Sequence, residues 1–214
     1  MTRFSEELKQ ASQPYWDEAV HHRFVSELLA GRVDDAVMGR YLVQDHRFID
    51  NFLILLGAAM SNADRFESRV VLGRFIGMIS GDENDYFLRS FAKLGVTEHE
   101  RQHQPDGEPT KGLNGIMLEA ARSGSYAAAI AVLAVAEGVY LDWGLRATQP
   151  YPESFLYTEW ITLHNNDYFV GFVEFLRREL DRVGPGSAAL CRDYFTRTVK
   201  LEKAFFDDAY NLPG

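Results

Sequence analysis

The stretch that decides the fold runs from Ser125 to Trp143 and reads SYAAAIAVLAVAEGVYLDW. Every position from Ala127 to Ala136 is apolar, which is typical of a helix buried on all its faces. Glu137 follows this run directly, and no cation comes after it until Arg146. An ionised carboxylate in an apolar interior is costly unless it is paired, hydrogen-bonded or protonated. We therefore expect Glu137 to face other polar groups inside the protein.

Two further acids occupy similar surroundings. Asp45 lies in RYLVQDHRFIDNFLILLG, on an apolar stripe with spacings of three and four residues, and Glu202 lies in YFTRTVKLEKAFFDDAY. For any one of them the commoner explanation is a place at the edge of the core, paired with Arg or Lys. Three acids on three apolar helices predict instead a polar pocket inside a bundle, and the residues alone leave both interpretations open.

Helical periodicity covers nearly the whole chain, and no sustained alternation between turns indicates strands. We predict an all-α protein, with a single-domain multi-helix bundle over residues 1–214. Glycines, prolines and capping residues divide it into about eight helices. The expected helices cover residues 14–30, 34–56, 65–80, 82–94, 110–122, 125 to the residues before Pro150, 155–163, 168–182 and 187–210.

One connection stands out as a loop. The stretch His99 to Gly112, HERQHQPDGEPTKG, combines proline, glycine and charge, and it follows a Thr97-x-x-Glu100 capping-box pattern. Its length would allow it to lie over the mouth of a site.

Composition limits the partners. The chain has 214 residues and a net charge of −9, from 31 acidic and 22 basic residues, which argues against a nucleic acid partner.

Its single cysteine, Cys191, fits a reducing compartment and looks like part of a helix interior. MTRFSEELKQ lacks the pattern of a signal peptide, and the Ala127 to Ala136 run is far short of the ~20 residues that span a bilayer. We expect a cytoplasmic protein with no membrane partner.

Common cofactor motifs are absent from the sequence. It has no His-Glu-x-x-His, Cys-x-x-Cys, Gly-x-Gly-x-x-Gly or phosphate-loop pattern, and the adjacent His21 and His22 splay apart on a helix. We therefore expect no metal and no cofactor. What remains is acids and aromatics. Burial raises carboxyl pKa values, and neighbouring acids split their titrations, so such a pocket supplies both a base and an acid. It also suits an aminopyrimidine, whose edge pairs with a carboxyl group.

Four segments resemble the TenA/thiaminase II family. They are RYLVQDHRF around Asp45, VAEGVYLDWG around Glu137, EWITLHNNDYF around His164 and TVKLEKAFF around Glu202, in the family's order and spacing. The similarity runs over nearly the whole chain. It implies a heme-oxygenase-like helical fold, salvage of thiamin breakdown products, and a homo-oligomer, either a dimer or a tetramer.

The resemblance also implies roles for individual residues. Asp45 matches the family acid that binds the aminopyrimidine edge, and Glu202 matches the glutamate of the C-terminal helix that transfers protons. Tyr140 matches a pocket tyrosine. Phe48 and His164 stand at substrate-binding positions where many members carry tyrosine.

One difference from the family's sequence pattern indicates which subgroup this chain resembles. Ala136 stands where part of the family has a cysteine nucleophile, so this chain resembles the cysteine-lacking subgroup, in which the neighbouring glutamate, here Glu137, belongs to the active site. The implied reaction is cofactor-independent hydrolysis of aminomethyl or formylaminomethyl pyrimidine to hydroxymethylpyrimidine, with Glu137, Glu202 and Asp45 as catalytic residues. Two alternatives stay open: a ligand-binding or regulatory protein on the same fold, and an oxidase-like relative acting on another heterocycle.

Overall fold

The computed structural model describes residues 2–211, and within them the chain is helical and contains no strand. The prediction of an all-α protein is confirmed. The helices, in order, are α1 (Phe4–Ala11), α2 (Tyr15–Val20), α3 (Arg23–Leu29), α4 (Asp35–Asn62), α5 (Phe66–Met78), a π-helical turn (Ile79–Glu83), α6 (Asn84–Leu94), α7 (Glu98–His103), α8 (Glu108–Arg122), α9 (Tyr126–Gly144), α10 (Phe155–Leu163), α11 (Asp167–Val183), a 3₁₀ turn (Gly184–Ser187) and α12 (Ala188–Asp208).

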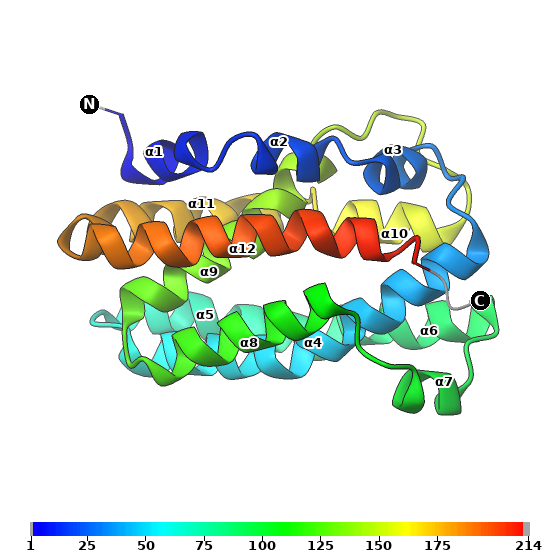
Figure 1. Cartoon of the computed structure of the whole chain (residues 1–214), viewed down its shortest axis with the longest axis horizontal. Coiled ribbons are helices and arrows are strands. Elements are labelled where there is room, and N and C mark those ends of the chain that lie inside the picture. Colours follow the sequence, from blue (N-terminus) through cyan, green and yellow to red (C-terminus); the bar gives the residue numbers. More distant parts are fainter. Residues whose placement is uncertain (1, 212–214) are drawn as a thin grey trace.

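Helix α9 forms the centre of the bundle. It passes between α4 and α8 on one side and α11 and α12 on the other (Figure 1), and every residue in it except Asp142 is buried. Its length and composition alone would suit a membrane span, but 94% of its most apolar window is buried inside the fold. Other helices therefore cover α9 on all sides, as its continuous apolar sequence predicts for a core helix.

The outer helices close the bundle around α9. Helices α4, α5 and α8 pack together, while α1 contacts α11 and α2 contacts α12. In Figure 1 the segment from α1 to α3 lies along the outside of α11 and α12. Gly138 allows α2 to approach α9 closely, because a Cβ atom there would lie 2.9 Å from the Trp16 ring.

Several predicted helix starts are confirmed by side-chain caps. Asp34 Oδ1 accepts a hydrogen bond from the Ala36 N–H at 2.9 Å, and Ser125 Oγ accepts one from the Ala128 N–H at 3.2 Å. These caps satisfy N–H groups that have no partner within the first turn. Helix α10, from Phe155 to Leu163, has the predicted bounds.

The single helix predicted over residues 14–30 is wrong. The chain forms α2 and α3 instead, with a break at His21 and His22. Nδ1 of His22 accepts the Phe24 N–H at 3.0 Å, so this histidine caps α3. Asparagine, aspartate, serine and threonine are the usual caps, and a histidine in that role leaves little trace in the sequence.

The loop predicted from His99 to Gly112 is also wrong over most of its length. The capping box of Thr97 and Glu100 is present, but it opens α7, and α8 already begins at Glu108. This segment is attached to the flank of α4. Arg47 donates hydrogen bonds to the carbonyl of Arg101 and to Asp106, and Gln44 accepts the Gly107 N–H at 2.9 Å.

No break separates α5 from α6. The chain remains helical through the π-helical turn, which contains one of the buried acids of the molecule, Glu83. A π-turn adds a residue to the helical repeat and rotates the following side chains relative to the preceding ones, and such turns are frequent at functional sites.

Candidate functional site

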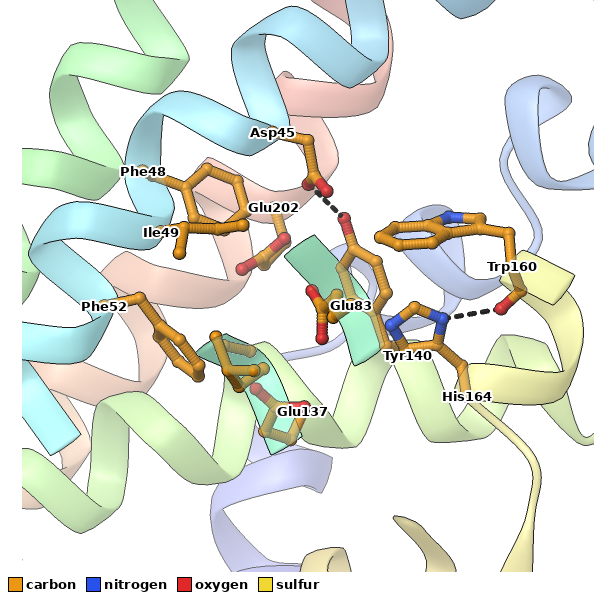
Figure 2. A pocket seen from close by; sticks show the side chains of 12 residues that line it. Asp45, Phe48, Ile49, Phe52, Glu83, Glu137, Tyr140, Trp160, His164 and Glu202 are labelled. Carbon is orange, nitrogen blue, oxygen red and sulfur yellow. Dashed lines mark hydrogen bonds between the residues drawn. The ribbon is translucent and has the colours of Figure 1, made fainter. Parts of the chain in front are cut away.

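Asp45, Glu137 and Glu202 line one cavity, although they belong to α4, α9 and α12 (Figure 2). The cavity has an empty volume of about 410 Å³, including the part open to solvent at its mouth. All six residues expected at the site line it. The complete lining is Asp45, Phe48, Ile49, Phe52, Ile79, Glu83, Ala136, Glu137, Tyr140, Trp160, His164 and Glu202.

The three predicted acids are buried without a cation. Asp45, Glu137 and Glu202 are 3%, 8% and 1% exposed, and no Lys or Arg within residues 2–211 forms an ion pair with them. The alternative of a carboxylate paired at the edge of the core does not describe these residues.

Glu179 shows what a structural buried acid looks like in this protein. It accepts hydrogen bonds from Ser68 and Tyr126, and it forms an ion pair with Arg182 at 2.7 Å. These donors hold the pKa of Glu179 below its usual value although burial opposes them. In the part of the chain that the structure describes, the cavity acids have no comparable set of donors, which leaves their oxygens for protons, water or a ligand.

Two tyrosines orient Asp45. The Tyr140 hydroxyl donates to Asp45 Oδ1 at 3.1 Å, and the Tyr41 hydroxyl lies 2.9 Å from the Tyr140 oxygen. Because Tyr140 has a single hydroxyl proton and donates it to Asp45, Tyr41 donates to Tyr140. This chain of hydroxyls occupies one oxygen of Asp45 and leaves Oδ2 without a protein partner among the described residues.

The acids hold their protons up to unusually high pH. Burial raises the pKa of Glu202 to about 8 and that of Glu137 well above its usual range, with nearby Glu83 and Glu202 adding to the effect on Glu137. Burial also raises the pKa of Asp45, although the Tyr140 hydrogen bond opposes the rise. Oε2 of Glu202 is buried, and no group within residues 2–211 forms a hydrogen bond with it. A group that titrates close to neutral pH, as Glu202 does, can serve as both a proton donor and a proton acceptor.

His164 contributes a neutral ring. Its Nδ1 lies 2.8 Å from the Trp160 carbonyl oxygen, and since a carbonyl only accepts, Nδ1 carries the proton. Burial lowers the pKa of His164 to about 4, so the ring is neutral near pH 7 and Nε2 is a hydrogen-bond acceptor.

Gly144 at the end of α9 places His164. A Cβ atom on Gly144 would lie 2.5 Å from the His164 carbonyl oxygen, so only glycine allows this approach. The side-chain amide of Asn165 stabilises the same contact by donating a hydrogen bond to the Gly144 carbonyl oxygen at 3.1 Å.

Aromatic rings form two walls of the cavity. Figure 2 shows Phe48 and Phe52 on one side and Tyr140 and Trp160 on the other. Phe48 packs edge-on against Phe205, with ring centroids 5.5 Å apart, and Tyr140 packs edge-on against Trp160 at 6.3 Å. Rings facing each other across a narrow space favour a flat, unsaturated ligand between them.

Sequence reasoning missed Glu83 and Trp160. Glu83 is the fourth buried acid of the cavity, and burial raises its pKa to about 8. In the sequence it belongs to SGDEND, at the start of the helix predicted over residues 82–94, and acidic residues are mostly exposed. Trp160 lies within the quoted segment around His164, where a large aromatic residue predicts burial but not a place in the cavity.

The idea that the segment from His99 to Gly112 lies over the mouth of the site is wrong. None of the residues from His99 to Gly112 lines the cavity, because Arg47 and Gln44 hold that segment on the flank of α4. Cys191 also lies outside the cavity, buried on α12 with its Sγ 3.7 Å from the Ala127 carbonyl oxygen. Among residues 2–211, no three His, Cys, Asp or Glu side chains are grouped so that they could hold a metal ion.

Comparisons with known proteins agree with this architecture. A family model described as TENA/THI-4/PQQC matches residues 9–212. An aminopyrimidine aminohydrolase of Halalkalibacterium halodurans is 24% identical over 97% of this chain and 96% of its own length. The TenA homologue of P. horikoshii superposes with a TM-score of 0.87, at 19% identity over 98% of this chain and 99% of that one. A domain of unknown function with a heme oxygenase-like fold from Shewanella denitrificans gives a TM-score of 0.70, at 16% identity over 96% of this chain and 91% of that one. The predicted heme-oxygenase-like fold is confirmed.

Proposed function

The chain belongs to the TENA/THI-4/PQQC family, and from that premise we propose that it is a cofactor-independent hydrolase of aminopyrimidines produced by thiamin breakdown. Its substrate is aminomethyl pyrimidine and its product is hydroxymethylpyrimidine; the N-formyl derivative reaches the same product by two hydrolyses, which release formate and then ammonia. The aminopyrimidine aminohydrolase named above supports the reaction class. The observation that carries the proposal is a cavity in which buried acids without a cation meet two aromatic walls.

Asp45 binds the ring edge in this proposal. A carboxyl group pairs with an aminopyrimidine edge through the exocyclic N–H and the neighbouring ring nitrogen. With Oδ1 held by Tyr140, the free Oδ2 and the proton that Asp45 retains match that edge. Phe48 and Tyr140 cover the two faces of the ring, and Nε2 of His164 accepts a further N–H.

Glu137 and Glu202 carry the proton transfers. One carboxylate takes a proton from water as the water oxygen bonds to the exocyclic methylene carbon, and the C–N bond breaks. The other, still protonated, gives its proton to the departing nitrogen, so that ammonia leaves the aminomethyl form. The raised pKa values support this division, because burial favours the protonated form of Glu137, while Glu202, with a pKa of about 8, exchanges its proton near neutral pH.

The test is incubation of the purified protein with aminomethyl and formylaminomethyl pyrimidines, followed by chromatographic detection of hydroxymethylpyrimidine and an assay for released ammonia or formate. We expect turnover of at least one of the two compounds, and a loss of about 10²-fold or more in Glu137→Gln and Glu202→Gln. Both substitutions keep the side-chain volume, and circular dichroism would verify the fold.

Cys191→Ala provides the matched control, because Cys191 is a buried residue outside the cavity. Its activity should equal that of the wild type. No product from either compound, or full activity in both glutamine variants, would overturn the proposal.

A further inference from the structure

We propose that Glu83 binds the departing amino group of the substrate, as the fourth acid of the cavity. This inference rests on the proposed function, and it assigns to one carboxyl group the recognition of the amine rather than of the ring.

Glu83 occupies the cavity without a protein partner. It is 9% exposed, lines the cavity, and makes no hydrogen bond or ion pair to another side chain in the described part of the chain. A buried carboxyl group in this condition is costly unless it keeps a proton or meets a cation. Its burial therefore favours a ligand that supplies a positive charge.

The π-helical turn accounts for this position. Glu83 is the last residue of the turn, while its neighbours Asp82 and Asp85 are exposed. Three acids thus stand within four residues, and only Glu83 lies in the cavity. Because π-turns are rare and cluster at functional sites, this local geometry supports a role for Glu83 beyond packing.

The arrangement of the acids separates a ring site from an amine site. Asp45, oriented by Tyr140, lies at one end of the view in Figure 2, Glu137 lies at the other, and the carboxyl group of Glu83 lies between them. Glu83 is also the acid whose charge raises the pKa of both Asp45 and Glu137 most strongly. A ring edge on Asp45 directs its exocyclic methylene group toward Glu83 and Glu137.

Binding of the amine is coupled to proton release. A Glu83 carboxylic acid meets an ammonium group, its proton leaves to solvent, and the resulting carboxylate accepts N–H bonds from the ammonium. The cation then lies beside Glu137 and Glu202. One of them, as a carboxylate, takes a proton from the ammonium and returns it to the nitrogen as ammonia leaves, and the other takes the proton of the attacking water. The binding step adds no net charge to the cavity, since one cation offsets one new carboxylate.

Calorimetric binding of two pyrimidines tests this assignment, with every titration of the amine made in a Glu202→Gln background so that hydrolysis does not consume it. Aminomethyl pyrimidine and hydroxymethylpyrimidine differ only in the amino or hydroxyl group. In Glu83→Gln we expect the Kd of the aminomethyl compound to rise about tenfold or more, because a hydrogen bond between charged groups is lost. The Kd of the hydroxymethyl compound should change less than about twofold, since neither partner is charged. Titrations at pH 7 in two buffers of different ionisation enthalpy should show that the variant releases fewer protons on binding the amine.

Asp82→Asn and Asp85→Asn are the matched controls, because they remove the same charge from exposed neighbours, and both should bind like the wild type. Equal affinity of the wild type and Glu83→Gln for the amine, or equal weakening for both compounds, would overturn the assignment while leaving the proposed function in place. Wild-type protein that binds both compounds but hydrolyses neither aminopyrimidine would refute the function and still test Glu83. Wild-type protein that binds neither compound would refute both.

Discussion

The hydroxyl of Tyr140 donates to Oδ1 of Asp45 at 3.1 Å, and this hydrogen bond joins the central helix α9 to α4 inside the cavity. Among the described residues it is the side-chain hydrogen bond that Asp45 accepts, while burial and the nearby Glu83 and Glu202 disfavour the charge of Asp45. The orientation of Asp45, and with it the ring site, therefore depends on one phenol.

Tyr140→Phe should weaken substrate recognition. Without the hydroxyl donor, the Asp45 carboxyl group can rotate, and its pKa rises further because the interaction that lowers it is gone. We expect kcat/KM to fall about 10- to 100-fold, mostly through KM. Tyr41→Phe is the graded control: it removes only the second hydroxyl of the chain and should cost less. Steady-state kinetics of both variants would contradict this order if Tyr41→Phe were the more damaging change.

The buried acids should make the protein less stable as pH rises. Glu202 has a folded pKa of about 8 against an ordinary value of 4.5, so between these values the folded state holds a proton that the unfolded state has lost. Unfolding free energy then falls with pH, by up to about 1.4 kcal/mol per pH unit for such a group, and the loss is complete above pH 8.

Glu202→Gln isolates this contribution. The variant has no carboxyl group to ionise, so we expect it to match the wild type near pH 5 and to exceed its stability near pH 8, by on the order of 1 to 4 kcal/mol. Urea denaturation at both pH values measures the difference, and comparing the two proteins cancels the titrating groups that do not interact with Glu202. A constant gap between variant and wild type across this range would contradict the raised pKa.

Much of the fold could be predicted because its causes are local. The apolar run of α9, the Ser125 and Asp34 caps, and the bounds of α10 all follow from neighbouring residues. The break at His22 and the helix within the residue range 99–112 could not, because they depend on a rare histidine cap and on Arg47, more than fifty residues away.

The same division applies to the site. Asp45, Glu137 and Glu202 stand out because each interrupts an apolar pattern, so their shared cavity could be anticipated. Glu83 has acidic neighbours on both sides, and only the π-helical turn brings it inward. No local pattern in the sequence distinguishes it from Asp82.

Gly144→Ala should disturb the site from outside the cavity. The added Cβ would lie 2.5 Å from the backbone oxygen of His164, and backbone cannot move aside as a flexible side chain does. We expect a loss of about 1 to 3 kcal/mol in unfolding free energy, together with lower kcat/KM as His164 shifts.

Gly115→Ala is the matched control for that change, since Gly115 is an exposed glycine on α8 whose added Cβ meets nothing within 4 Å. It should keep full activity and gain up to about 1 kcal/mol of stability, as helix propensity favours alanine. Equal stability and equal activity of the two variants would show that the approach of α9 to His164 is not tight.

Ala136→Cys, made in a Cys191→Ala background, should place a reactive thiol inside the cavity. Ala136 lines the cavity beside Glu137, whereas Cys191 is buried elsewhere and burial raises the pKa of its thiol to about 11. A small thiol reagent should therefore modify the introduced cysteine and leave the wild-type protein unmodified under native conditions.

Nearby carboxyl groups disfavour the thiolate of the introduced cysteine, so its modification should be slow and should accelerate with pH. Hydroxymethylpyrimidine at ten times its Kd should slow it about tenfold, because only the free protein reacts. Mass spectrometry of the modified fraction over time measures both rates, and a modification rate that the pyrimidine leaves unchanged would separate the ligand from this cavity.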